Sequence, residues 1–505
     1  MDYNAIIIGG GISGLSCAAS LAAQGKKVLV LEKHSVAGGL IQTFKHKEWK
    51  WNVGTHAMGP MEDNFITRCF NYLTDNKISF FKVDDASAEI NFSDKKFIVM
   101  NNRNKFIESL IEAFPEEKNS IISFIEKMEF IFNRKHLNII PKLLPLPLAK
   151  ISYPIVTFSI HKYLNKSLKE MLDLHFKSIT LKNIIAFHCN KMGASPEDIS
   201  FIAYSLIFVT YIEGCYYPHG SGDSIVTSLS DFICNKGGTI STNADVKQII
   251  IDNNKATGVV LKNNTKITAD IVISSIGIPE TVKYFSMEKS LKREVKMTSD
   301  LKRSYSLMVL YVGFKGQLSD LNIGSRLYRW VFSSEDKALL NPANNNWEPE
   351  YITIYFSLNN KQIGDNPTAQ ILVPADYSFF EKWENTKTGS RGEEYDQLKN
   401  SISEKLTTIL IQKFPGIEQH IAYTCLGTPL TFSNFIAPLN GSVYRLTPSV
   451  NKYNNTNLSP RSSLKNLFLT GSDIFMHGIT GSFLSGIITA SSICGKNLLS
   501  EFSKK

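Results

Sequence analysis

Three glycines near the start of the chain have the spacing of a phosphate-binding loop. Gly9, Gly11 and Gly14 follow the apolar run 5–8, and Glu32 ends a second apolar run. In such a loop the first glycine makes a tight turn, the second lets the backbone approach a pyrophosphate, and the third lets the next helix pack on the strand. The acid suits a ribose hydroxyl, so the sequence predicts a dinucleotide site. The predicted contacts of this half-site are Gly9, Gly11, Ile12, Ser13, Gly14, Glu32 and Lys33.

Further glycines favour a flavin dinucleotide over a nicotinamide one. Gly38-Gly39 is a pair that NAD does not need, and glycines let the backbone approach the longer flavin. Near the other end, a strand at 467–470 runs into Gly471 and Asp473. There the carboxylate would accept hydrogen bonds from ribityl hydroxyls, and the next helix would point its positive end at the flavin ring. The further FAD contacts predicted are Gly38, Gly39, Leu40, Val53, Gly54, Thr55, His56, Val246, Gly471, Asp473, Gly478, Ile479 and Thr480.

Five side chains are candidates for chemistry at a flavin. Hydride transfer needs chiefly a C–H or double bond held about 3 to 3.5 Å from the ring, so an acid or base is optional. The side chains that could donate a proton or stabilise a carbocation are His477, His56 and Tyr217, with Tyr216 and His219 beside them. Each also suits a packing or flavin-orienting role, and His477 is preferred because it adjoins the C-terminal motif. The histidines lack metal-ligand spacing, and we expect no metal.

These residues need a parallel sheet and its helices to bring them together. Apolar runs at 5–8 and 28–31 predict buried parallel strands around a thin helix from Ile12 to Gly25. Val246 opens one of the later short strands, where it either contacts the adenine or is a plain strand residue. Short strands are predicted at 237–240, 246–251, 256–261 and 269–275, and antiparallel strands at 307–314, 351–357 and 370–373. A nearly uncharged helix is predicted over 199–212, and a capping box at Ser167 and Glu170 opens another.

Composition limits the class of protein. The 505 residues are 43% hydrophobic, enough for two or three domains. The net charge of +9 is spread thinly and no nucleic-acid-binding module accompanies it, so we expect no nucleic acid. Seven widely spaced cysteines without a C-x-x-C pair indicate free thiols in a reducing compartment. The first strand begins at once, without room for a signal peptide, so a cytoplasmic protein is expected.

The segment around 135–165 is unusually apolar for a connection. Prolines from Pro141 to Pro154 are expected to prevent a continuous helix, while bulky aliphatic residues alternate with lysines. Lysine stems can lie along apolar surface with their charges at lipid phosphates. We interpret the segment as a membrane-facing patch at the mouth of a hydrophobic tunnel, and a buried loop is the alternative. The lysines are Lys135, Lys142, Lys150 and Lys162.

With these motifs in place, the chain resembles the phytoene desaturase superfamily of flavoproteins, in its carotenoid isomerase and retinol saturase branch. The resemblance covers nearly the whole length. It implies FAD, a long apolar polyene or other isoprenoid substrate, and peripheral membrane contact. Departures are Leu40, where amine oxidases have arginine, Tyr444-Arg445 in place of Tyr-Gly, and His219. The matching stretches are 9–14 with Glu32, 38–39, 53–56, 143–148, 214–220, 427–431 and 469–475.

The expected fold is α/β: a Rossmann-like FAD-binding domain of the glutathione-reductase and amine-oxidase type, with a discontinuous α+β substrate domain. The FAD-binding domain is predicted from 1–64, 214–285 and 461–505, and the substrate domain from 65–213 and 286–460.

The predicted activity is desaturation, saturation or cis–trans isomerisation of the polyene. No second glycine fingerprint occurs, so NAD(P)H is expected only as an external reductant, and the electron donor or acceptor stays open. The alternatives are a flavin amine oxidase and a non-enzymatic prenyl-binding chaperone.

Overall fold

The first sheet grows from the apolar runs that the sequence places at both ends of the chain. The computed structural model describes residues 1–505 except 84, 94, 135–138, 322, 325, 333–348, 358–365 and 437–438. Strand β1 pairs in parallel with β2 and β12, and β12 pairs in parallel with β18, so the last strand of the chain lies one position from the first. In spatial order the strands are β10 (Val246–Asp252), β11 (Lys255–Leu261), β12 (Lys266–Ser274), β1 (Tyr3–Ile8), β2 (Val28–Leu31) and β9 (Thr239–Ser241), with β18 (Leu467–Leu469) beside β12.

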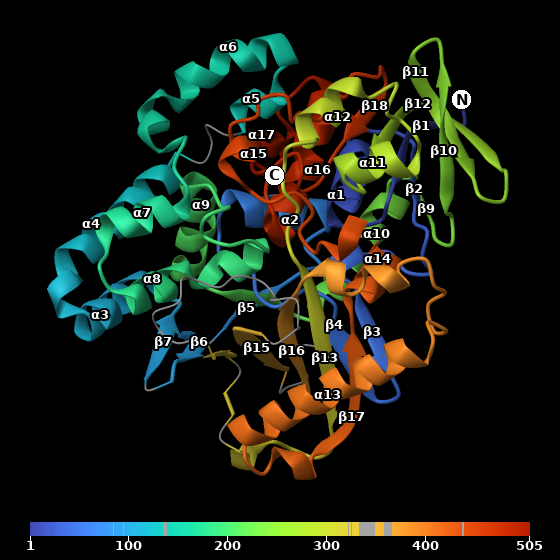
Figure 1. Ribbon diagram of the computed structural model, residues 1–505. Helices are drawn as coiled ribbons and strands as arrows, with labels where there is room; N and C mark the ends of the chain where they lie inside the picture. Colours follow the sequence, from blue (N-terminus) through green and yellow to red (C-terminus); the bar gives the residue numbers. More distant parts are fainter. Residues whose placement is uncertain are drawn as a thin grey trace.

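Helices from remote parts of the sequence pack together on one face of this sheet (Figure 1). Phe70 stacks on Phe483, with ring centroids 3.7 Å apart, and joins α2 to α16. The domain boundary expected at residue 64 therefore separates α2 from the core in which it packs. Small residues make α1 thin, as expected, which allows the close approach of α16. These helices are α1 (Ile12–Ala23), α2 (Phe65–Leu73), α10 (Ser221–Asn235), α16 (Gly478–Cys494) and α17 (Leu498–Phe502).

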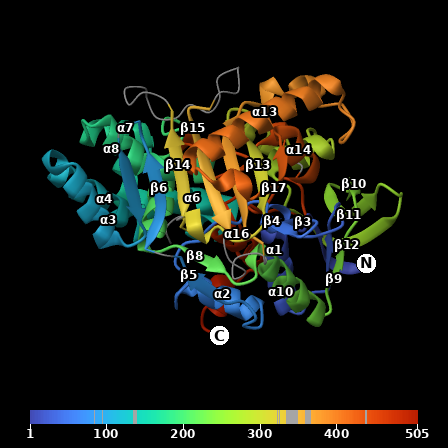
Figure 2. The ribbon, with the colours of Figure 1, turned by 90° about the horizontal axis from the view of Figure 1, so that it is seen from below.

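A second sheet forms the floor of the other part of the molecule (Figure 2). The three antiparallel strands expected from the sequence form its centre, and β14, β17, β6 and β7 extend it. Helix α13 (Glu393–Lys413) covers one face through Ile402, Leu406 and Leu410. On the other face lies the hairpin of β3 (Thr43–His46) and β4 (Trp49–Asn52). The strand order is β17 (Ile421–Gly427), β13 (Ser306–Phe314), β16 (Thr368–Ala375), β15 (Tyr351–Ser357), β14 (Leu327–Val331), β6 (Ala86–Asn91) and β7 (Lys96–Met100).

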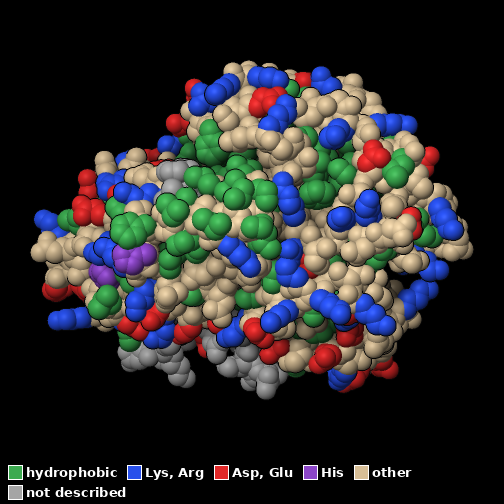
Figure 3. All heavy atoms as spheres, turned by 90° about the horizontal axis from the view of Figure 1, so that it is seen from above, with side chains coloured by type: hydrophobic (Ala, Val, Ile, Leu, Met, Phe, Trp, Pro, Cys, Tyr) green, Lys and Arg blue, Asp and Glu red, His purple; other side chains and the backbone are tan. Residues whose placement is uncertain are grey.

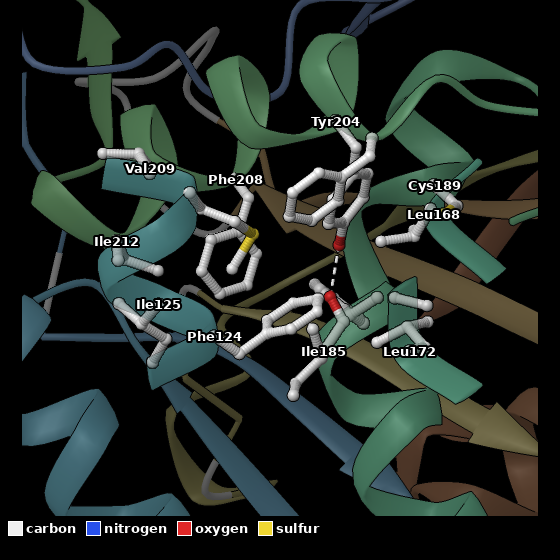
Figure 4. Packing of buried hydrophobic residues seen from close by; sticks show 14 of the residues in the cluster. Phe124, Ile125, Leu168, Leu172, Ile185, Cys189, Tyr204, Phe208, Val209 and Ile212 are labelled. Carbon is white, nitrogen blue, oxygen red and sulfur yellow. Dashed lines mark hydrogen bonds between the residues drawn. The ribbon is translucent and has the colours of Figure 1, made fainter. Parts of the chain in front are cut away.

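A helical unit beside the second sheet has its own apolar core (Figure 4). Phe124 and Phe208 face each other there, and the Tyr204 hydroxyl donates to the carbonyl of Ile185. The uncharged helix expected over 199–212 is α9, which begins at Phe201 and is buried almost throughout. The helices of this unit are α3 (Arg103–Ala113), α4 (Lys118–Phe132), α7 (Leu168–His175), α8 (Ile179–Ile185) and α9 (Phe201–Glu213).

The apolar segment that the sequence analysis interpreted as a broken, membrane-facing stretch is helical. Helices α5 (Ile140–Leu143) and α6 (Leu146–Thr157) are separated at Pro145, but α6 continues through Pro154, so the expectation about that proline is wrong. Residues 135–138, including Lys135, lie outside the described residues. The outward face of α6, together with the first residue of η4, carries a stripe at helical spacing whose members are 52%, 66%, 72% and 74% exposed: Leu148, Ile151, Ile155 and Phe158.

Viewed from the side on which α6 lies, hydrophobic side chains gather over the middle of the surface (Figure 3). Within the described part of the chain, no helix is both long and apolar enough to cross a membrane.

The remaining strands β5 (Phe80–Lys82) and β8 (Tyr216–Pro218) pair with each other. The remaining helices are α11 (Ile278–Tyr284), α12 (Lys292–Thr298), α14 (Pro429–Ile436) and α15 (Val450–Tyr453). The short 3₁₀ helices are η1 (Gly39–Ile41), η2 (Pro115–Glu117), η4 (Phe158–Tyr163), η5 (Ala186–Met192), η6 (Ser319–Leu321), η7 (Tyr377–Phe379), η8 (Glu381–Trp383), η9 (Ile417–Gln419) and η10 (Leu439–Gly441).

Candidate active site

The glycine loop lies between the end of β1 and the start of α1. Gly9 has a φ of +97°, which glycine adopts without strain. A β-carbon on Gly14 would collide with the carbonyl of Gly9, whereas one on Gly11 would meet nothing within 4 Å. No side chain caps α1. The N–H groups of its first turn are therefore available to an anion such as a pyrophosphate.

A cavity of about 620 Å³ lies beside this loop and receives residues from both ends of the chain. Its size suits a bound cofactor. Six of the predicted contacts are not on its wall: Gly14, Val53, Thr55, His56, Asp473 and Thr480. The predicted contacts that line it are Gly9, Gly11, Ile12, Ser13, Glu32, Lys33, Gly38, Gly39, Leu40, Gly54, Val246, Gly471, Gly478 and Ile479.

Glu32 is buried in the wall of this large cavity and holds the glycine loop. Its carboxylate accepts hydrogen bonds from the backbone N–H of Gly10 at 2.8 Å and of His34 at 2.9 Å. Both bonds orient the charge at the end of β2, where the sequence predicts a ribose contact. Its neighbour Lys33 donates to the carbonyl of Asn434 at 3.1 Å, and burial lowers the pKa of Lys33.

The C-terminal motif supplies the opposite wall. His477 occupies the N-cap position of α16 without a capping side-chain bond, and Gly478 and Ile479 line the cavity. The positive end of α16 therefore faces the cavity and favours negative charge there. Thr480 does not reach the wall. Together with the uncapped α1 and the Glu32 carboxylate, this arrangement fits FAD.

Asp473 has a different place from the one expected. Its carboxylate is 2% exposed and accepts hydrogen bonds from the N–H groups of Ile278, at 2.9 Å, and Leu446, at 3.3 Å. It lines a smaller cavity of about 60 Å³ beneath α5 and α6 rather than the large one. The carboxylate thus ties α11 to the backbone at Leu446, instead of facing the cavity where ribityl hydroxyls were expected. Sequence spacing alone does not distinguish these two roles.

The three catalytic candidates do not form one cluster. His477 Nε2 lies 3.0 Å from the carbonyl of Leu446, and burial holds its pKa well below the usual value. His56 stacks on Tyr355 with ring centroids 3.9 Å apart, and burial lowers the pKa of His56 to about 3. Tyr217 is buried with its hydroxyl against Asn52. His56 and Tyr217 line one small cavity together, whereas His477 borders the large cavity.

The two neighbouring candidates have structural contacts of their own. The hydroxyl of Tyr216 contacts the carboxylate of Glu62, and the ring of His219 lies 4.8 Å from that of Phe81. Neither residue lines the large cavity or the two small cavities near His56. These contacts favour the packing role that the sequence analysis kept open for both residues.

Two further cavities of about 70 Å³ each lie on the side of the second sheet, and both are lined by His56, Lys191 and Tyr355. One of them shares Leu40 and Tyr444 with the large cavity, so it adjoins the predicted flavin site. The sequence analysis missed Lys191. It lies in η5, and no motif or periodicity marks it as different from other lysines.

Two further lysines, the buried Lys452 and the half-buried Lys142, border the cavity beneath α6. Lys452 donates to the carbonyls of Leu446, at 3.0 Å, and Ser472, at 2.9 Å, and burial lowers its pKa to about 8. Lys142 donates to the carbonyl of Leu458, and burial, with a smaller repulsion from Lys452, lowers its pKa to about 7. Lys452 lies against His477, which connects this cavity to the large one.

The fold and the paired half-sites define a flavin-dependent oxidoreductase. Residues 12–494 match the family described as flavin containing amine oxidoreductase, and the chain belongs to this family. It is 28% identical to the all-trans-retinol 13,14-reductase of Rattus norvegicus, over 99% of this chain and 86% of that protein. It is 27% identical to the chloroplastic prolycopene isomerase of Daucus carota, over 87% of this chain and 71% of that protein.

A solved structure of putrescine oxidase has the same fold. It superposes with a TM-score of 0.67 at 14% identity, over 98% of this chain and 100% of that one. The amine-oxidase-like fold, the flavin cofactor and the branch expected from the sequence are confirmed. The protein is therefore an FAD-dependent oxidoreductase.

Proposed function

We propose that this enzyme acts on carbon–carbon double bonds of a long apolar polyene, by saturation, desaturation or cis–trans isomerisation. One observation carries the choice of substrate class. The two small cavities near His56 have no aspartate or glutamate among their described lining residues, and both contain Lys191. A protonated amine would meet a cation there rather than a carboxylate. The geometry therefore disfavours the amine oxidase alternative, in spite of the shared fold.

The residues of the chain bind and orient the cofactor and the substrate, and they exclude water from the site. When bound, FAD accepts or supplies a hydride equivalent. The glycine loop and α16 would hold it from opposite sides. Leu40 and Tyr444, which border two cavities, would separate it from the two small cavities near His56, which together form the proposed substrate chamber. His56 and Tyr355 form a flat, stacked wall against which a planar polyene can lie. With His56 and His477 neutral, alignment rather than proton transfer is the proposed contribution of these side chains.

Saturation is the direction we favour. The retinol reductase of Rattus norvegicus is 28% identical over 99% of this chain, against 26–27% identity over 87–97% of this chain for the prolycopene isomerases. Isomerisation keeps support from the second relative and needs no net electrons. NAD(P)H stays in the proposal only as an external reductant.

We also propose that the α6 face contacts a membrane peripherally. Ile151 and Ile155 point outward on α6, while Tyr153 of the same helix lines the cavity beneath it. Exposed Lys150 and Lys162 flank the stripe and suit anionic lipid headgroups. One helix thus separates an apolar outer surface from an inner cavity that reaches His477. An apolar substrate would enter by this route.

The test is anaerobic incubation of the purified, reduced enzyme with all-trans-retinol, lycopene isomers and unsaturated lipids. Flavin absorbance and product mass are read together. A gain of two hydrogens with flavin oxidation supports saturation, and unchanged mass with altered retention supports isomerisation. Peroxide release from polyamines without any change of polyenes would establish the amine oxidase instead. A protein that stays colourless after FAD reconstitution would support the chaperone alternative.

A further inference from the structure

Lys191 lies in the wall of the proposed substrate chamber, and none of the described carboxylates forms an ion pair with it. We propose, on the basis of the proposed function, that the substrate is an unsaturated carboxylic acid whose carboxylate binds at Lys191 while its apolar chain lies toward the flavin. The ammonium group lies 3.2 Å from the centroid of the Tyr211 ring, and Lys191 lines both small cavities. Burial lowers the pKa of Lys191 to about 8, with a further lowering by Arg329. The lysine remains largely charged at neutral pH.

A second cation, the fully buried Arg329, interacts electrostatically with the half-buried Lys191. Arg329 is 1% exposed and lies between the rings of Phe187, at 4.1 Å, and Tyr351, at 4.8 Å. Its Nη1 donates to the carbonyl of Phe187 at 3.2 Å, but Nε and Nη2 have no hydrogen-bond partner. Ring faces stabilise a guanidinium only partly, because they offer no acceptor for its N–H groups. The positive potential of this side chain therefore extends into the chamber.

No acid among the described residues compensates these two charges. The groups that favour the charged form are Cys215 for Lys191, and Tyr351, Tyr305, Tyr355 and Cys189 for Arg329. The remaining cation of the walls, Arg326, faces Glu89 at 3.9 Å. Buried charges are normally paired, since an unpaired ion loses its hydration without compensation. Two neighbouring cations that lack a carboxylate partner beside a cavity indicate that the ligand supplies the anion.

The chemistry of the chamber selects a carboxylate on an apolar chain. Each small cavity has a volume of about 70 Å³, which is enough for a carboxylate with a water but restrictive for a larger headgroup. The Tyr305 hydroxyl donates to the carbonyl of Asn190 at 3.4 Å, so the hydroxyl of Tyr351, 3.3 Å away from it, can donate to the second carboxylate oxygen. One negative charge matches the single ammonium group that reaches the cavities. The neutral His56–Tyr355 stack then faces the unsaturated chain.

The test uses the oxidised holoenzyme and two probes that differ only in charge, cis-parinaric acid and its methyl ester. The conjugated tetraene absorbs where tryptophan emits, so binding is read as tryptophan quenching. We expect the acid to bind at least about tenfold more tightly than the ester, since a charged hydrogen bond contributes that much. Lys191→Met should remove this preference and leave ester affinity unchanged, while Lys191→Arg should keep it. Lys236→Met, at an exposed lysine that also lies over an aromatic ring, is the matched control.

Three outcomes separate the possibilities. Equal affinities for acid and ester in the wild type, or an equal loss of both in Lys191→Met, would overturn the carboxylate assignment. If Lys191 serves only the negative charge of reduced flavin, the oxidised enzyme will not distinguish the probes, which overturns it as well. An acid preference without any change of polyene double bonds would support the carboxylate site and contradict the proposed function. Flavin content checks that each variant is folded.

Discussion

Gly486 of α16 lies so close to Ser16 of α1 that a β-carbon at position 486 would collide with Ser16 Oγ. The Ser16 hydroxyl in turn donates to the carbonyl of Phe483 at 2.9 Å. The two helices that carry the half-sites of the predicted FAD site are thus joined by direct contact of small residues. Any widening of this contact moves the two walls of the cavity apart.

Gly486→Ala should therefore destabilise the protein and weaken FAD retention. Overpacking of a tight core contact costs about 1–3 kcal/mol, and the Ser13 carbonyl beside Gly486 is backbone that cannot rotate away. Thermal unfolding and the flavin-to-protein ratio measure the two effects. A β-carbon on Gly495, at the end of the same helix, would meet no atom within 4 Å. Gly495→Ala should therefore lose only the stability that the strained φ of +70° costs, and it should retain flavin. Equal flavin loss in both variants would contradict the contact as the cause.

Removal of the Glu32 carboxylate should lower FAD affinity by about 10–100-fold. The carboxylate holds the N–H groups of Gly10 and His34, and a hydrogen bond to a charged group contributes about 1.5–3 kcal/mol. Glu32→Ala is compared with Glu48→Ala, an exposed acid on the β3–β4 turn. Fluorescence titration of the apoproteins with FAD gives the two dissociation constants. Unchanged affinity in Glu32→Ala would show that the loop needs no carboxylate.

Stability should rise with pH above neutrality through Lys142. The pKa of Lys142 is lowered from its usual value to about 7, so between pH 7 and the usual lysine range the unfolded chain binds the proton more strongly than the folded one. Unfolding becomes less favourable as pH increases wherever the unfolded state holds more protons. Lys142→Met should reduce the increase in Tm from pH 7 to about 9, because methionine cannot titrate. The smaller rise that remains comes from Lys191 and Lys452, whose pKa values burial lowers to about 8. Lys150→Met on the exposed face of α6 should retain the wild-type slope, and identical slopes in all three proteins would contradict the assignment.

The rate of the chemical step should show no histidine titration. Burial holds the pKa of His56 at about 3 and that of His477 well below the usual value, so both rings stay neutral through the ordinary histidine range of about pH 5 to 8. Single-turnover flavin oxidation by a polyene, followed over this range, should give a flat profile. An inflection near neutrality that disappears in His477→Gln would mean that His477 transfers a proton.

Polar substitutions on α6 should weaken membrane contact. The double variant Ile151→Ser, Ile155→Ser removes two side chains that are 66% and 72% exposed on one helix face. Each buried isoleucine contributes about 1.5–3 kcal/mol, so binding to vesicles with anionic lipid should fall at least about tenfold. Sedimentation with vesicles measures the bound fraction. Ile251→Ser on β10 is the control, and an equal loss there would assign the contact to another surface.

The flavin half of the molecule was predictable because its signals are local. Runs of buried aliphatic residues, glycines at a tight turn and small residues on α1 follow from backbone geometry over a few positions. The fold class and the flavin cofactor are confirmed by the family match and the shared fold, while the individual contacts of the two motifs stay predictions. The contact that joins α2 to this half was not predictable, since no sequence pattern around Phe70 indicates that it stacks on Phe483.

Features that depend on tertiary contacts were outside the reach of the sequence. Pro154 lies within α6. A proline removes one backbone hydrogen bond from a helix, but on this exposed helix water can satisfy the freed carbonyl. Asp473 matches the flavin motif in type and position, yet its carboxylate faces two backbone N–H groups. Lys191 and Arg329 are far apart in the sequence. They become neighbours only because η5 packs near β14, and neither forms an ion pair with a described carboxylate.

The contact between α1 and α16 also determines when the cofactor can be taken up during synthesis. The glycine loop is synthesised more than 400 residues before its partner strand β18 (Leu467–Leu469) and the helix after it. Nascent chains up to that point present half a flavin site and an uncovered apolar helix, a form that invites aggregation. Chaperones should consequently protect nascent chains until β18 and α16 have been made, because both walls of the flavin site exist only from that point on.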